Sequence, residues 1–129
     1  MKHKRLSQAV QIILMSIGFY ASAAAEVTVQ KDTWVKGMEN VLPAAFCTDG
    51  SYFRSCFSIP VSECHKVATK STASCLRQHD TEIPTQLIQP KDGSLWGQKV
   101  GTCAGTVFAA TLKEKFISNS KCNDPSAWK

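Results

Sequence analysis

This chain of 129 residues lacks several features that would assign it directly to a class of protein. It has no internal repeat, no low-complexity tract, no block of like charges and no Pro- or Gly-rich linker, so its body is predicted to be one domain. It lacks the G-x-S-x-G motif that presents a nucleophilic serine in many hydrolases. It also has no N-x-S/T acceptor for N-glycosylation. This absence, together with the compact export signal described below, favours a bacterial protein.

No apolar run is long enough to anchor the chain in a bilayer, which takes about 20 residues. The longest uncharged apolar stretch covers residues 9–20. It follows a basic start over residues 2–5 and precedes the small residues 21–25. This order predicts a cleavable signal peptide over residues 1–25. We therefore expect a periplasmic or secreted mature domain over residues 26–129, with no membrane span of its own.

The net positive charge is also small once the signal peptide is removed. The whole chain has a net charge of +5, but three of its 15 Lys and Arg residues lie in the signal and all 10 acidic residues lie after it. The mature net charge is therefore only +2. A clustered basic surface, the mark of a nucleic-acid-binding domain, is not indicated.

The six cysteines of the chain all lie in the mature region. An even number in a short exported protein predicts three disulfides. Zinc sites pair ligands two to four residues apart, whereas the closest cysteines here are eight apart, so we expect no metal and no other cofactor. The cysteines are Cys47, Cys56, Cys64, Cys75, Cys103 and Cys122.

Helical periodicity in three segments predicts an all-α, single-domain bundle of about three helices with irregular loops. The first helix is expected over residues 32–42, with Val41 on its apolar face and Pro43 ending or kinking it. The second is expected over residues 62–78 and the third over residues 94–117. The polar segment between the second and third helices is expected to be extended or irregular.

The second helix restricts the disulfide pairing. Cys64 and Cys75 are 11 residues apart, so they share one face but are separated by about 16 Å along the axis. A disulfide tolerates only about 6 Å between Cα atoms. A Cys64–Cys75 bond is therefore excluded, and the remaining pairings stay open.

The third helix carries glycines at successive i+4 positions, Gly97, Gly101 and Gly105. Glycine in a helix costs up to about 1 kcal/mol relative to alanine, so something must approach the backbone closely there. Packing inside the domain is the ordinary explanation, and contact with a partner is the alternative.

Candidate catalytic residues are few. His79, Asp80 and Glu82 form the densest ionisable cluster, which could orient an imidazole or bind a cation, although such a cluster is more often a solvated helix end. Six disulfide-bonded cysteines leave no free thiolate nucleophile. Paired carboxylates for glycoside hydrolysis are a weaker possibility. The candidates would be Glu39, Glu63, Glu82 and Asp92. An enzyme is therefore less expected than a binding protein.

Aromatic residues gather in a segment that begins and ends with a cysteine. Its candidate binding residues are Asp49, Tyr52, Phe53 and Arg54. If Cys47 bonds Cys56, the loop is rigid, and Tyr and Arg on a rigid loop are typical anchors of protein contacts. Alternatively, its aromatics complete the small core.

Three basic residues share one face of the second helix: Lys66, Lys70 and Arg77. They suit an acidic partner, an anionic glycan or a phospholipid surface, but also an ordinary solvated helix face.

These observations favour an exported, non-enzymatic protein-binding domain. Its partner would be another exported or envelope protein, and an inhibitor or an immunity protein against an envelope-acting toxin would be examples. The alternatives are a small secreted hydrolase or toxin acting on the envelope and an accessory subunit of an envelope or secretion assembly.

Overall fold

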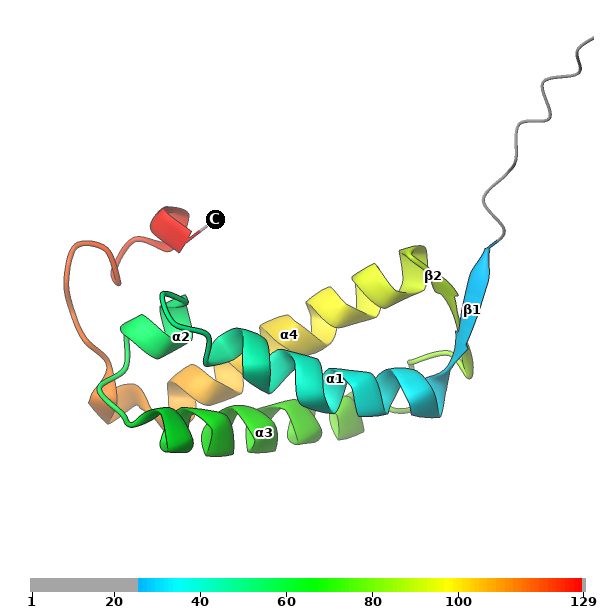
Figure 1. The fold of residues 1–129 in the computed structure, drawn as a ribbon, viewed down its shortest axis with the longest axis horizontal. Coiled ribbons are helices and arrows are strands. Elements are labelled where there is room, and N and C mark those ends of the chain that lie inside the picture. Colours follow the sequence, from blue (N-terminus) through cyan, green and yellow to red (C-terminus); the bar gives the residue numbers. More distant parts are fainter. Residues whose placement is uncertain (1–25, 129) are drawn as a thin grey trace, which may run out of the picture.

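The computed structural model describes residues 26–128, so the predicted signal peptide lies outside the described residues. The elements follow one another along the chain in the order shown in Figure 1. They are β1 (Val27–Gln30), α1 (Lys31–Phe46), α2 (Tyr52–Ser55), α3 (Val61–Gln78), β2 (Gln86–Gln89), α4 (Lys91–Thr111) and two 3-10 helices, Lys113–Lys115 and Pro125–Trp128.

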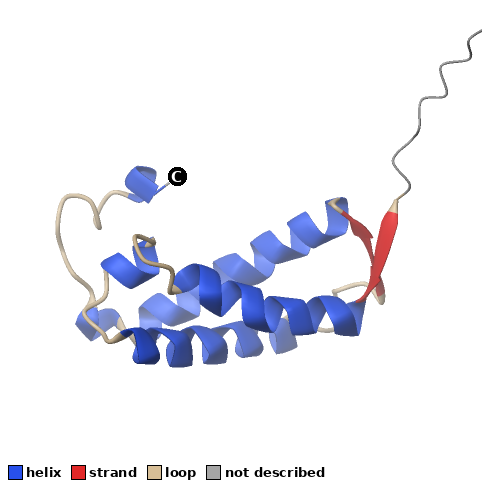
Figure 2. Ribbon diagram, in the orientation of Figure 1, coloured by secondary structure: helices blue, strands red, loops and turns tan. Residues whose placement is uncertain are grey.

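Three long helices form the body of the domain, which confirms the all-α prediction (Figure 2). Helix α3 packs against both α1 and α4. The buried positions recur at helical spacing, for example Ala68 and Cys75 on α3 and Val100, Ala104 and Phe108 on α4. Amphipathic faces of this kind bury their apolar side when three helices meet.

Helix α1 does not end at Pro43, so of the two predicted effects of this proline, an end or a kink, the end is wrong. Proline removes one intrahelical donor, but the Cys47 N–H still donates to the Pro43 carbonyl at 3.1 Å, and the helix runs on to Phe46. Pro43 and Phe46 are both buried, so their burial offsets the lost bond. The apolar face also differs from the prediction, because Val41 is 59% exposed.

The second predicted helix is correct to within one residue, whereas the third begins and ends earlier than predicted. Helix α4 begins at Lys91, directly after Pro90, and Asp92 in its first turn accepts a hydrogen bond from the Ile88 N–H at 2.7 Å. It ends at Thr111, and the extended backbone at Phe116 forms an antiparallel bridge with Phe57.

A short antiparallel ribbon joins β1 to β2, with Val29 opposite Leu87. The prediction of irregular or extended structure after the second helix did not include this pairing. The partner strand lies almost 60 residues earlier, and the buried Leu87 fixes the ribbon against the helices. Figure 1 shows the ribbon at one end of the molecule, away from α2.

Three disulfides cross-link the fold: Cys47–Cys64, Cys56–Cys122 and Cys75–Cys103. Cys64 and Cys75 bond to different partners, as their spacing on one helix requires. Cys47 does not bond Cys56, so the aromatic loop is not closed by its own two cysteines. Instead, α3 is bonded to the end of α1 at one level and to α4 at another.

The tail after α4 returns to α2. Cys122 bonds Cys56, and the Trp128 ring makes an edge contact with Tyr52 at 5.6 Å between centroids. Trp128 Nε1 also donates to the Lys121 carbonyl at 2.9 Å. Over residues 26–128, no helix combines the length and apolarity that a membrane crossing requires.

Candidate functional site

A groove of about 650 Å³ lies between α3 and α4. Val67 from α3 and Val107 from α4, both half-buried, contribute apolar walls. Ser71 is only 2% exposed yet lines the groove, so its polar side chain lies at the bottom. The full lining is Pro60, Ser62, Glu63, Lys66, Val67, Lys70, Ser71, Val107 and Thr111.

The charged residues of the groove all come from α3. Lys66 and Lys70 are exposed, whereas Glu63 is half-buried. Among the described residues, neither groove lysine forms an ion pair with an acid. Two unpaired ammonium groups over a partly apolar groove favour an anionic ligand. Arg77, predicted to share their face, is exposed at the end of α3 and does not line the groove.

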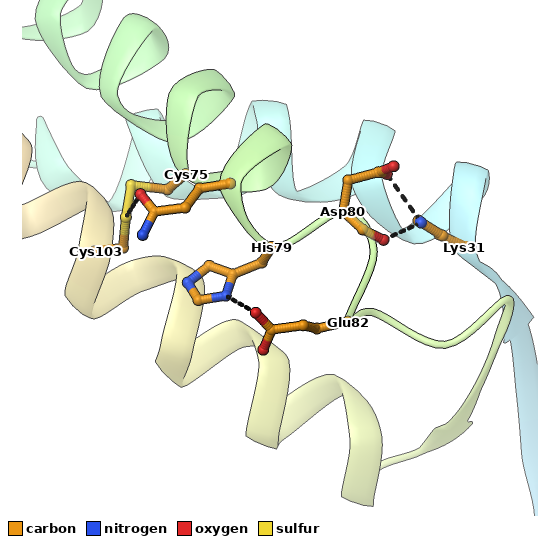
Figure 3. Close-up of polar contacts among 7 residues, drawn as sticks. Lys31, Cys75, His79, Asp80, Glu82 and Cys103 are labelled. Atoms are coloured by element: carbon orange, nitrogen blue, oxygen red, sulfur yellow. Dashed lines mark hydrogen bonds and ion pairs between the residues drawn. A yellow bond between two sulfur atoms is a disulfide. The ribbon is translucent and has the colours of Figure 1, made fainter.

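The predicted catalytic cluster is divided in the structure (Figure 3). Asp80 faces Lys31, with 2.9 Å between Oδ1 and Nζ, and its backbone carbonyl accepts a second hydrogen bond from the same ammonium group. His79 lies on the other side, with Nδ1 4.0 Å from Glu82 Oε1. Asp80 therefore does not orient the imidazole.

The surroundings of His79 contain no activated nucleophile. Its ring contacts the edge of Trp96 at 6.0 Å between centroids. It shares a shallow surface pocket with Cys103, but Cys103 is bonded to Cys75 and lies 3.6 Å from Gln78 Oε1 (Figure 3). At 4.0 Å, the His79–Glu82 contact is also too long for a hydrogen bond. The geometry thus supports a long polar contact at a helix end more than a catalytic dyad.

The other candidate carboxylates are separated, since Glu39 is exposed on α1, Glu63 lines the groove and Asp92 binds the Ile88 N–H. No three potential metal ligands come together within residues 26–128.

The candidate binding loop carries helix α2. Phe53 stacks on Phe46 at 4.1 Å between centroids, and Tyr52 lies against Phe53 at 5.1 Å. Arg54 Nη1 donates to the Ile59 carbonyl at 3.0 Å. Asp49 is exposed, while the other three are half-buried. The aromatics of this loop therefore complete the core, and a binding role for the loop stays a prediction.

The sequence indicated the lysines of the groove but not the groove itself. Its second wall comes from Val107 and Thr111, about 40 residues further along the chain. A visible signal was Ser71, a small polar residue on the apolar face of the second helix, which marks the position where that face is not covered by a large side chain.

The fold and groove together define a small, disulfide-cross-linked helical protein with one basic groove and no assembled catalytic group among the described residues. The family model described as "T2SS substrate NttA" matches residues 28–116. The chain therefore belongs to the NttA family of type II secretion system substrates and is an exported protein, periplasmic or secreted. No curated protein and no solved structure matches the chain significantly.

Proposed function

We propose that this exported protein is a non-enzymatic binding protein and that the α3–α4 groove holds an anionic part of its partner. The observation that supports this most is the pair of unpaired lysines, Lys66 and Lys70, at the edge of a groove with partly apolar walls. Two of the three disulfides hold α3 in place, so the groove is formed before a ligand arrives, and little entropy is lost on binding.

The partner that we propose is another exported or envelope protein. Inhibition of an envelope-acting enzyme, or immunity against such a toxin, would be specific forms of this binding. A hydrolytic role for His79, Asp80 and Glu82 receives less support, since Asp80 is turned towards Lys31 and His79 has no hydrogen-bonded acid.

The test is capture of exported proteins by the oxidised mature chain. Immobilised wild type is compared with Lys66→Glu/Lys70→Glu after incubation with periplasmic extract and spent medium, and bound proteins are identified by mass spectrometry. We expect one stoichiometric partner on the wild type and at least a roughly tenfold loss on the double variant, because two favourable charges become repulsive.

The matched control is Lys36→Glu/Lys91→Glu, which makes the same change of net charge at exposed lysines outside the groove. This control should retain the partner. Equal capture by all three proteins would contradict the groove as the site. Loss of capture on Arg54→Ala alone, with the groove variant unaffected, would place the site at the α2 loop instead.

A further inference from the structure

The charge order along α3 narrows the class of ligand that fits the groove. We infer that the groove binds an extended acidic peptide segment, and this inference rests on the proposed function. The segment would have two carboxylates at alternate positions, preceded by a basic group. The carboxylates face Lys66 and Lys70, and the basic group faces Glu63.

The spacing of the two lysines matches an extended chain. Lys66 and Lys70 are four residues apart on α3, which is about 6 Å along the helix axis. Residues i and i+2 of an extended peptide point to the same side and lie about 6.6–6.8 Å apart. Acidic side chains at alternate positions can therefore each meet one ammonium group, whereas adjacent acids would point to opposite sides.

Glu63 selects against a ligand that is negative throughout. It lines the same groove one turn before Lys66, at about 4.5 Å along the axis, and is half-buried. A uniform polyanion, such as a sulfated glycan or an anionic lipid surface, would place negative charge against this carboxylate. A peptide can put a lysine, an arginine or its amino terminus there.

The uncharged lining suits a peptide main chain. Ser62 and Ser71 offer hydroxyl groups that can donate to carbonyls or accept from amides. Thr111 Oγ1 donates to the Val107 carbonyl at 2.7 Å and can accept from an amide. Val67 and Val107 add apolar surface between them for the carbon atoms of the segment. Such a mixture of apolar walls and a few polar groups is typical of a groove that orients its ligand.

The test uses fluorescence anisotropy with a labelled peptide, Lys-Ser-Asp-Val-Asp-Val, on the oxidised mature protein. We expect Lys66→Glu/Lys70→Glu to weaken binding at least about tenfold and Lys36→Glu/Lys91→Glu to leave it unchanged. A peptide of the same composition with its two Asp residues adjacent should bind at least about tenfold more weakly. Glu63→Gln should weaken binding of the original peptide but strengthen binding of a version with Ser in place of Lys.

Heparin and vesicles containing phosphatidylglycerol serve as the polyanion probes. Binding of either that requires Lys66 and Lys70, without binding of the peptide, would overturn the inference. Equal binding of the peptides with alternate and with adjacent Asp residues would also overturn it, because the spacing of the two carboxylates would then not affect affinity. These outcomes can be distinguished from failure of the proposed function. If the proposed function is wrong, capture of exported proteins does not depend on the groove.

If a partner is captured through the groove but the peptide does not displace it, the inference is refuted and the proposed function is not.

Discussion

At the residue scale, the core contains a polar atom without a partner. Thr72 is fully buried on α3, and its Oγ1 has no hydrogen-bond partner in the described structure. Burial of an unbonded hydroxyl costs free energy, because the group loses its bond to water. Ser71, its neighbour in sequence, differs in that it lines the groove, where a ligand could satisfy it.

Thr72→Val should therefore stabilise the protein by about 1 kcal/mol, since it removes the hydroxyl and nearly keeps the shape. Chemical denaturation followed by circular dichroism measures the change in the free energy of unfolding. Thr69→Val, at an exposed position of the same helix, is the control and should change stability by less than about 0.5 kcal/mol. A clear destabilisation by Thr72→Val would show that Oγ1 has a partner in solution.

At the scale of elements, the glycines of α4 lie where other side chains approach the helix. An added Cβ would lie 3.9 Å from Met38 Cε at Gly97 and 3.7 Å from Leu42 Cδ2 at Gly101, which are ordinary contacts. At Gly105 it would lie only 2.9 Å from Phe53 Cζ. Packing inside the domain is therefore what meets this face of α4, and of these three glycines Gly105 is the one that requires the absence of a side chain.

Alanine at these positions should have opposite effects. Gly101→Ala should stabilise the protein by up to about 1 kcal/mol, because alanine favours the helix and meets no clash. Gly105→Ala should destabilise it by about 1 kcal/mol or more, because Phe53 is held between Phe46 and Phe108 and cannot move freely. Thermal unfolding compares the two variants.

The Phe53→Leu background tests the cause of the second effect. In this background, Gly105→Ala should cost less than it does with Phe53 present, because the shorter side chain relieves the contact. An unchanged cost would mean that the glycine is required for a reason other than Phe53.

At the scale of the whole molecule, the disulfides contribute stability that a domain of this size needs. Their sequence separations are 17 residues for Cys47–Cys64, 28 for Cys75–Cys103 and 66 for Cys56–Cys122. The entropy that a cross-link removes from the unfolded chain increases with the length of the closed loop. The bond to the tail, which closes the longest loop, is therefore the one that restricts the unfolded chain most.

Replacement of Cys56 and Cys122 by alanine should cost about 4 kcal/mol, against about 3 kcal/mol for the Cys47 and Cys64 pair. Guanidinium unfolding of the two double variants measures the difference. The reverse order would indicate that the Cys47–Cys64 bond contributes through packing at the α1–α3 contact rather than through loop closure.

Much of the fold follows from the sequence, because helical periodicity is a local property. The positions of α3 and most of α4, the exclusion of a Cys64–Cys75 bond and the packing role of the glycines could all be predicted. Errors arose where distant residues override local preference. Pro43 stays in a helix because its ring and Phe46 are buried, and β2 forms because β1 supplies its hydrogen bonds.

The sequence by itself determined that this is a small helical domain with paired cysteines. It also determined the order of the charged residues along α3. Only the tertiary structure decided which cysteines pair, that Asp80 turns from His79 to Lys31, and that Val107 completes a groove beside Lys66 and Lys70. The physical reason is that periodicity specifies which face of a helix is buried. Which helix covers that face, and where it leaves a groove, depends on side chains far apart in the chain.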